Sequence, residues 1–359
     1  MKKLFFLTFI TSCFFSVFGQ VRVETADYLS FIHQDSMKRT MQDLENFTTR
    51  YAPLGNRRVA KYVQQRLVNY GVTNAVIDSF YLEHDIWFDN YNLFSGYGYN
   101  VRGSIIGTQN PDSIVIIGAH LDAINLARDE SYHYVLNKEL TPGADDNASG
   151  IATMIEMARI MHQYHLKPQN RIDLLAFDFE ELGLFGSSYD ARRRITENDK
   201  VILMINNDMV SYQPVGEDYA INIHWYDNAI EEAEYAAELC REYSTITPIV
   251  PQGNDNNMRE RSDSWEYAQR GIKSIFFIEH TFTPSYHTQY DLCDSSNYDY
   301  IQEVGKVNFS LLNHYARFDN DGTKIRPAGN REALSISPNP TTGQLRITNY
   351  KLQITGRRC

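Results

Sequence analysis

SIVIIGAH (residues 113–120) is an apolar run that ends in a histidine, and three later runs follow the same plan. They are RIDLLAFDFEE (171–181), VILMINND (201–208) and KSIFFIEH (273–280), each closed by acidic or histidine side chains. A short apolar run bounded by polar residues is typical of a buried strand. In an open α/β sheet, ligands collect outside the carboxyl ends of the parallel strands. The four runs therefore predict one shared site at a single edge of a sheet.

Strand and helix patterns alternate along most of the chain. Strands are predicted at 75–82, 99–106, 113–119, 172–178, 201–206 and 273–278. Helices are predicted at 29–47, 56–70, 149–163, 228–243 and 298–316. This alternation predicts one α/β domain with a largely parallel central sheet. Two polar stretches, 124–145 and 251–264, are expected to form binding loops, and the second is expected to stay outside the core.

The composition excludes several classes of protein. With 359 residues, of which 43% are hydrophobic, the chain can bury a sizeable core. Its formal net charge is −11, and no basic run lies outside the extreme N-terminus. A nucleic-acid partner is therefore not expected, because such binding depends on lysine and arginine neutralising phosphates.

The N-terminus has the composition of a secretory signal peptide, predicted at residues 1–19. Lys2 and Lys3 precede an apolar run, and small residues at Val17 and Gly19 fit a cleavage site. The run is short for a membrane anchor, and a lipoprotein signal around Cys13 is the remaining alternative. We therefore expect export without a membrane span.

Three cysteines would remain after cleavage, which are Cys240, Cys293 and Cys359. Their scattered spacing is not that of a disulfide framework. Cys240 lies in a helical pattern and is expected in the core, and a bridge to Cys293 is left open.

Six polar side chains at or just beyond the strand ends are candidates for one metal site. They are His120, Asp146, Glu180, Glu181, Asp208 and His287. Two imidazoles and three carboxylates form a ligand set that suits two zinc ions roughly 3.5–4 Å apart. A remaining glutamate could act as a general base, and Asp122 could orient the ring of His120. Taken singly, each has an ordinary alternative: a core histidine, a helix cap or a solvated loop residue.

Five motifs, GAHLDA, PGADDNASGIA, FDFEELGLFGS, NNDMV and YHTQYD, occur in this order within roughly residues 100–315. In this order they resemble the co-catalytic zinc aminopeptidases related to the leucyl aminopeptidase of Vibrio, whose relatives include glutamate carboxypeptidase and glutaminyl cyclase. The resemblance implies a mixed, mostly parallel eight-stranded sheet sandwiched between helices. It also implies a secreted dinuclear zinc exopeptidase, in the first place an aminopeptidase.

The resemblance further implies a role for each candidate residue. It assigns His120 and Asp208 to one zinc ion, Glu181 and His287 to the other, and Asp146 to both. Glu180 would be the general base that acts on a zinc-bound water, and Asp122 would orient His120. The expected partner is a peptide substrate.

Two other functions stay open on the same motifs. A glutaminyl cyclase is an acyltransferase that uses similar ligands with one zinc ion. A non-catalytic binding protein could share the fold, because a fold does not fix a function. The sequences DNASG (146–150) and GLFGS (183–187) favour the peptidase over the cyclase. The intact Glu180 and the complete ligand set argue against the binding protein.

Two hypotheses concern substrate binding. Glu279, at the end of the run 273–280, could receive the α-amine of a substrate. Arg259 and Arg261, in the polar stretch 251–264, could meet a substrate carboxylate, although solvated loop arginines are common.

The C-terminal stretch SISPNPTTGQL (335–345) resembles the opening of the sorting domain used in type IX secretion. We therefore predict a zinc peptidase domain at 20–318, a linker at 319–333 and a partial sorting domain at 334–359. A disordered tail is the alternative. The type IX machinery is a possible partner, and the expected location is secreted or cell-surface, or periplasmic if the signal does not work.

Overall fold

The computed structural model describes residues 21–128, 134–320, 337–338 and 345–346. The chain divides into two units, Met1–Thr323 and Lys324–Cys359. In the second unit, β14 (Ser337–Pro338) and β15 (Leu345–Arg346) form an antiparallel pair. The predicted signal peptide lies outside the described residues, as does nearly all of the predicted linker and sorting domain. These three assignments therefore stay predictions.

The first unit is built on an eight-stranded sheet with the order β11-β10-β12-β9-β4-β8-β3-β2. The strands are β2 (Val76–Ile86), β3 (Asn92–Ile105), β4 (Asn110–His120), β8 (Asn170–Phe177), β9 (Lys200–Asn207), β10 (Ala220–Trp225), β11 (Thr247–Ile249) and β12 (Ser274–Glu279). The neighbours β12, β9, β4 and β8 run parallel, as do β10 and β11, and the other three pairings are antiparallel. The expected mixed, mostly parallel sheet is confirmed.

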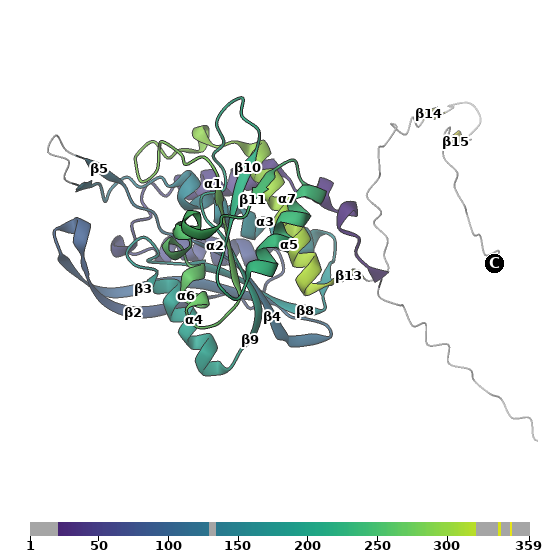
Figure 1. Cartoon of the computed structure of the whole chain (residues 1–359), viewed down its shortest axis with the longest axis horizontal. Helices are drawn as coiled ribbons and strands as arrows, with labels where there is room; N and C mark the ends of the chain where they lie inside the picture. Colours follow the sequence, from purple (N-terminus) through teal and green to yellow (C-terminus); the bar gives the residue numbers. More distant parts are fainter. Residues whose placement is uncertain (1–20, 129–133, 321–336, 339–344, 347–359) are drawn as a thin grey trace, which may run out of the picture. The chain divides into compact units, whose positions relative to one another are not determined.

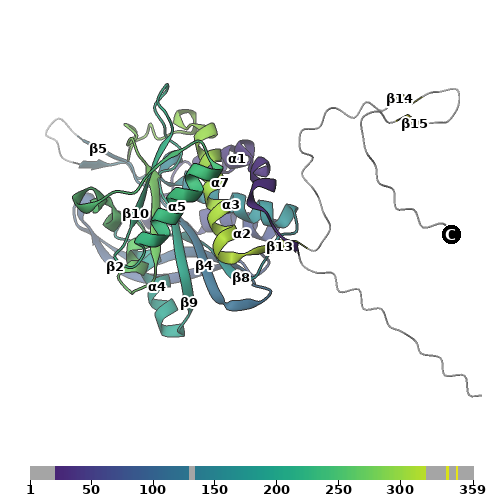
Figure 2. The ribbon, with the colours of Figure 1, turned by 45° about the vertical axis from the view of Figure 1, so that its right-hand side comes forward.

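Helices cover both faces of this sheet (Figures 1 and 2). They are α1 (Gln34–Glu45), α2 (Arg57–Asn69), α3 (Ser149–Gln163), α4 (Phe185–Glu197), α5 (Ile230–Tyr243), α6 (Ser264–Ala268) and α7 (Tyr298–Ala316). Successive side chains of β4 point to opposite faces. Val115 and Ile117 join the core under α1, α3, α5 and α7, whereas Ile114 and Ile116 join the core under α4 and α6. Burial on both faces explains why β4 is a continuous apolar run instead of an alternating one.

Shorter elements complete the unit. β1 (Val21–Arg22), β13 (Phe318–Asn320) and β7 (Lys167–Pro168) form a small sheet, and β5 (Leu126–Arg128) pairs with β6 (Tyr134–Leu136). The short helical turns are η1 (Thr25–Asp27), η2 (Leu29–Phe31), η3 (Ala52–Leu54), η4 (Trp87–Asp89), η5 (Ala144–Ala148), η6 (Gly253–Arg261) and η7 (Cys293–Ser295). Cys240 and Cys293 are both buried, and neither is in a disulfide.

The structure corrects the expected position of the polar stretch 251–264. It forms η6 and the start of α6, and four of its polar side chains are buried: Asn256, Ser262, Asp263 and Ser264. Asn256 bonds to Trp225 and to His224 Nδ1, and the Ser262 hydroxyl bonds to two side chains of the candidate site. Polar side chains can be buried here because each of these contacts satisfies a hydrogen-bonding group.

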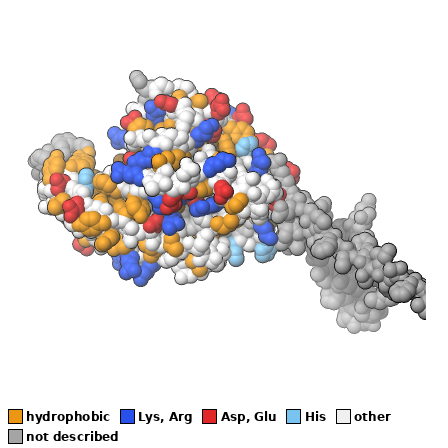
Figure 3. Space-filling view, turned by 90° about the horizontal axis from the view of Figure 1, so that it is seen from below, with side chains coloured by type: hydrophobic (Ala, Val, Ile, Leu, Met, Phe, Trp, Pro, Cys, Tyr) orange, Lys and Arg blue, Asp and Glu red, His pale blue; other side chains and the backbone are white. Residues whose placement is uncertain are grey.

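The hairpin of β2 and β3 carries a concentration of exposed apolar side chains. They are Val76, Tyr81, Leu93 and Tyr97, joined by Trp87 and Tyr91 in the connection. In Figure 3, orange side chains gather toward the left-hand end of the folded unit, the side on which Figure 1 places this hairpin. Within the described part of the chain, no helix combines the length and the hydropathy needed to cross a membrane.

Candidate metal centre

The parallel strands bring the candidate residues together, because β4 lies between β8 and β9 and all three end at the same edge of the sheet. His120 is the last residue of β4, and Asp208 directly follows β9. Glu180 and Glu181 lie in the turn after β8. The other two come from loops: Asp146 from η5, before α3, and His287 from the segment after β12. All six predicted side chains meet in one place.

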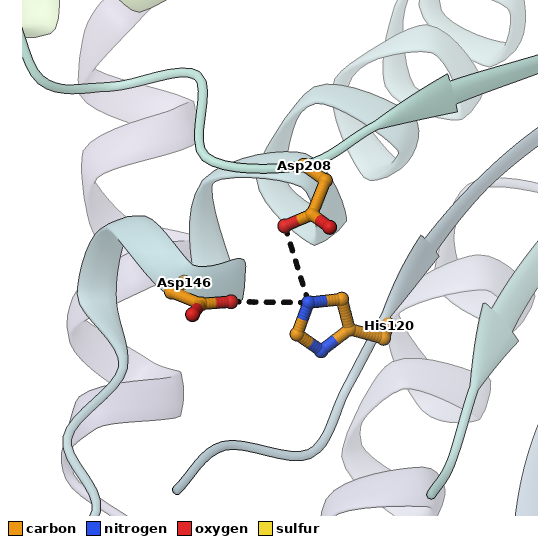
Figure 4. Close-up of side chains that lie close together, drawn as sticks. All are labelled: His120, Asp146 and Asp208. Atoms are coloured by element: carbon orange, nitrogen blue, oxygen red, sulfur yellow. Dashed lines mark hydrogen bonds and ion pairs between the residues drawn. The ribbon is translucent and has the colours of Figure 1, made fainter. Parts of the chain in front are cut away.

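The first group of ligand atoms comes from His120, Asp146 and Asp208, and the two carboxylates meet at one ring nitrogen of His120 (Figure 4). His120 Nε2 lies 3.1 Å from Asp146 Oδ1 and 3.2 Å from Asp208 Oδ1. All three residues are buried. A single ring nitrogen can donate only one proton, so it cannot satisfy both carboxylates. A cation between the three atoms would satisfy all of them.

The second group shares Asp146 with the first. His287 Nε2 lies 3.1 Å from Asp146 Oδ2 and 2.9 Å from Glu181 Oε2. Neither contact has hydrogen-bond geometry, so this buried nitrogen has no hydrogen-bond partner among the residues that the structure describes. Asp146 thus offers one carboxylate oxygen to each group, which is the arrangement that a bridging ligand requires.

The ring of His120 is held from its other side. Its Nδ1 lies 3.2 Å from the main-chain oxygen of Asp122 and 3.6 Å from the Asp122 carboxylate. A proton on Nδ1 would leave the lone pair of Nε2 free for a metal ion. The Asp122 carboxylate itself accepts the backbone N–H groups of Glu180, at 3.1 Å, and Glu181, at 3.3 Å. Asp122 therefore fixes the glutamate pair as well as the segment that holds the histidine.

The carboxylate of Glu180 accepts no hydrogen bond from the described residues, and it belongs to neither of the two ligand groups that share Asp146. It is only 7% exposed, and its Oε2 lies 4.0 Å from His120 Nε2. Glu180, Glu181 and His120 also form a third possible ligand group. The geometry therefore allows either a free carboxylate or a metal ligand at this position.

Burial and mutual charge shift the protonation of the whole cluster. Burial raises the pKa of Glu181 to about 7, with a further contribution from Asp146. Burial alone would lower the pKa of His287, but Glu181 and Asp146 raise it to about 10. Burial raises the pKa of Glu180 well above its usual range. The site thus holds excess negative charge that protons or cations must neutralise.

Ser262 was not singled out in the sequence, yet its buried hydroxyl contacts a candidate ligand. It donates to Asp208 Oδ2 at 2.6 Å and accepts from Asn206 Nδ2 at 2.6 Å. This fixes one oxygen of Asp208 and leaves the other facing His120. Asp291, in the motif YHTQYD, similarly accepts the backbone N–H groups of Asp145 and Asp146. Neither role has a signal in the sequence, because both depend on contacts across long stretches of chain.

Arg50 is a third supporting residue that the sequence did not reveal. Its fully buried guanidinium donates to the carbonyl oxygens of Leu121, Pro142 and Gly143. Leu121 follows His120, and Gly143 begins the loop that carries Asp146, so Arg50 ties together two segments that supply ligands. Burial lowers the pKa of Arg50, and the carboxylates of Asp291, Asp122 and Asp146 act against that shift.

The pocket above the carboxylates has an apolar wall. The side chains of this wall are Met209, Met258, Phe276, Ile278, Phe282 and Tyr286. Arg261 is the one basic residue that lines the pocket in the described part of the chain. An apolar wall beside a charged cluster would separate an apolar substrate side chain from a polar reacting group.

The hypothesis that Glu279 receives a substrate amine is not supported. Glu279 is 1% exposed and accepts the backbone N–H of Thr283, and its Oε2 has no hydrogen-bond partner among the described residues. Burial, together with the charge of Asp145, raises the pKa of Glu279 to about 12. Glu279 is therefore buried and does not line the pocket where a substrate amine would lie.

A protein-family model and a known relative both match this chain. The model of peptidase family M28 matches residues 100–312. A probable leucine aminopeptidase of Arthroderma benhamiae is 26% identical over 301 residues, which cover 80% of this chain and 73% of the relative.

Solved structures share the fold. LapB from Legionella pneumophila superposes with a TM-score of 0.65 at 22% identity, covering 81% of this chain and 74% of LapB. BSAP, a zinc aminopeptidase from Bacillus subtilis, has a TM-score of 0.61 at 15% identity, covering 79% of this chain and 95% of BSAP. A Bacteroides thetaiotaomicron glutaminyl cyclase has a TM-score of 0.60 at 20% identity, covering 78% of this chain and 97% of the cyclase. At these identities the structural likeness establishes the fold alone.

Proposed function

Since the chain belongs to peptidase family M28, we propose that it is a dinuclear zinc aminopeptidase that removes N-terminal residues from peptides. The observation that carries this proposal is the pair of ligand groups that share Asp146 through different oxygens, with the buried carboxylate of Glu180, 4.0 Å from His120 Nε2, beside them. The names of the relatives, among them a probable leucine aminopeptidase and a zinc aminopeptidase, support it.

The residues fit zinc. Zinc accepts imidazole nitrogen and carboxylate oxygen, and both groups consist of these donors. His120 and Asp208 would hold one ion, Glu181 and His287 the other, and Asp146 both. The unsatisfied buried atoms Glu181 Oε1 and His287 Nε2 argue for a cation, because buried polar groups without partners are costly.

When bound, the two ions would supply Lewis-acid chemistry, which polarises a peptide carbonyl and lowers the pKa of water. Glu180 would take a proton from the attacking water and deliver it to the nitrogen of the leaving amine. Asp122 would hold Glu180 in place through the backbone N–H of that residue, and would keep the ring of His120 oriented through Nδ1.

Secretion is part of the proposal and rests on the sequence. The signal-peptide composition of residues 1–19 and the resemblance of 335–345 to a type IX sorting domain support an exported enzyme. An N-terminal peptide sequence of the mature protein, recovered from culture medium, from the cell surface or from periplasm, would test both.

The experiment that tests the activity uses two peptides that differ only at the N-terminus. The zinc-loaded full chain is incubated with Leu-Ala-amide and with N-acetyl-Leu-Ala-amide, and products are followed by mass spectrometry. The proposal expects leucine to be released from the first peptide alone, and expects a chelator to abolish the release. Cleavage of neither, with conversion of glutaminyl peptides to the pyroglutamyl form, would replace the peptidase by a cyclase.

A further inference from the structure

Arg261 occupies a distinctive place at the candidate site, since the other charged residues lining the pocket are acidic. It shares the pocket with Asp146, Glu180, Glu181 and Asp208. Its side chain is exposed, and among the described residues it makes no hydrogen bond and no ion pair. The positive charge of Arg261 is therefore available to a ligand that enters the pocket.

The other arginine of the same segment, Arg259, has its charge paired with an acidic side chain. Arg259, two residues earlier, is paired with Asp227, with Nη1 3.2 Å from Asp227 Oδ1. Arg259 is absent from the residues that line the pocket at the metal centre. The two arginines of one short turn thus have different surroundings, and of the two only Arg261 lines the pocket with the carboxylates.

The backbone on either side of Arg261 is fixed. The hydroxyl of Tyr226 donates to the carbonyl oxygen of Arg259 at 2.6 Å. Ser262 is fully buried and donates to the candidate ligand Asp208 at 2.6 Å. Arg261 is therefore the direct neighbour of a residue that bonds to a candidate metal ligand, and a fixed backbone lowers the entropic cost of using its side chain for binding.

Charge balance indicates what this side chain would bind. In the proposed enzyme, two divalent ions offset the charges of Asp146, Glu181 and Asp208, and Glu180 adds one negative charge. The guanidinium of Arg261 then remains as a positive group at the mouth of the pocket. A guanidinium presents a planar fork of donors that matches a carboxylate.

We propose that Arg261 binds the C-terminal α-carboxylate of short peptides, so that di- and tripeptides with a free C-terminus are the preferred substrates. This assignment rests on the proposed aminopeptidase function. The C-terminus is the anion that every unmodified peptide carries. With about 3.3–3.6 Å of extended chain per residue, only a C-terminus one or two residues beyond the scissile bond stays near the pocket.

The test compares kcat/KM for Leu-Ala and Leu-Ala-amide, which differ only in the C-terminal charge. The zinc-loaded full chain is used as wild type, as Arg261→Gln and as the matched control Arg259→Gln. We expect the wild type and the Arg259 variant to favour the free acid by roughly 10- to 100-fold, the range for a hydrogen-bonded charge. In the Arg261 variant the ratio should fall to within about threefold of unity.

Each other outcome overturns the assignment. A wild type that cleaves both peptides equally well, or an Arg261→Gln variant that keeps the full preference, would show that Arg261 does not bind the α-carboxylate. If Leu-Asp-amide has the same kcat/KM as Leu-Ala in the wild type, and this value falls in the Arg261→Gln variant, the residue recognises acidic side chains instead. In all these cases Leu-Ala-amide is still cleaved, whereas cleavage of neither peptide would overturn the proposed function and this assignment with it.

Discussion

Replacing Glu180 by glutamine separates catalysis from metal binding. The substitution preserves the shape of the side chain, which is 7% exposed, and breaks no hydrogen bond of the carboxylate in the described structure. We therefore expect the variant to fold and to bind two zinc ions. A positioned general base contributes about 10²- to 10⁴-fold to a rate. The kcat should fall by that factor, which at 1.36 kcal/mol per tenfold is about 2.7–5.4 kcal/mol of activation free energy.

The assay measures kcat on leucine p-nitroanilide together with zinc content by mass spectrometry. Glu181→Gln is the control, because Glu181 Oε2 lies 2.9 Å from His287 Nε2 in the second ligand group. This control should lose one zinc ion, whereas Glu180→Gln should keep both. Near-normal turnover in Glu180→Gln would refute its role as the base. Loss of a zinc ion from that variant would show that Glu180 is a ligand, as the third possible group allows.

Three further predictions address the ligands and their support. Asp146→Asn weakens both ligand groups, so zinc content should fall below one ion per chain; two retained ions would disprove the bridging role. In the metal-free protein the pKa of His287 is raised to about 10 and that of Glu181 to about 7, so both bind protons that zinc must displace. Zinc affinity, measured calorimetrically from pH 6 to 8, should therefore rise by up to about tenfold per pH unit for each proton displaced, and a flat profile would contradict this. Arg50→Met leaves the buried carbonyls of Leu121 and Pro142 without a donor, at about 1–3 kcal/mol each, whereas Gly143 O keeps the backbone N–H of Ala148. The free energy of unfolding in urea should fall by at least about 2 kcal/mol, and a fall below about 1 kcal/mol would contradict the account.

The sequence predicted the strands that build the site well, because their burial on both faces leaves a clear signal. β4, β9 and β12 agree with the predicted runs to within a few residues, and the polar residues that follow β4, β8 and β9 do converge. Parallel strands covered by helices on both faces are continuously apolar, and their carboxyl ends meet at one edge of the sheet. Strands of this kind, and the site at their ends, can therefore be predicted from a local pattern.

Elements with mixed patterns were missed. α4 was not among the predicted helices, since it buries charged side chains, with Arg194 bonded to Asp190 and Asp173. β10 was not predicted, because the polar His224 alternates with its isoleucines and is buried only through its bond to Asn256. Such burial depends on partners far away in the chain, which a local pattern does not contain.

The supporting residues of the site show the same limit. The side chain of Asp122 was expected to orient His120, but its carboxylate bonds to the backbone of the two glutamates and lies 3.6 Å from the ring. Arg50 acts by donating to backbone carbonyl oxygens. Every residue has a backbone carbonyl, so the sequence does not indicate which ones Arg50 contacts. Ligand types and their order can be predicted locally, whereas the contacts that position them require the fold.

The most direct test of a dinuclear zinc enzyme is a titration of the metal-free full chain with zinc, following bound metal and release of leucine together. The account predicts saturation at two ions per chain, with activity lost again when the ions are removed. Saturation at one ion, or activity that does not depend on zinc, would contradict it.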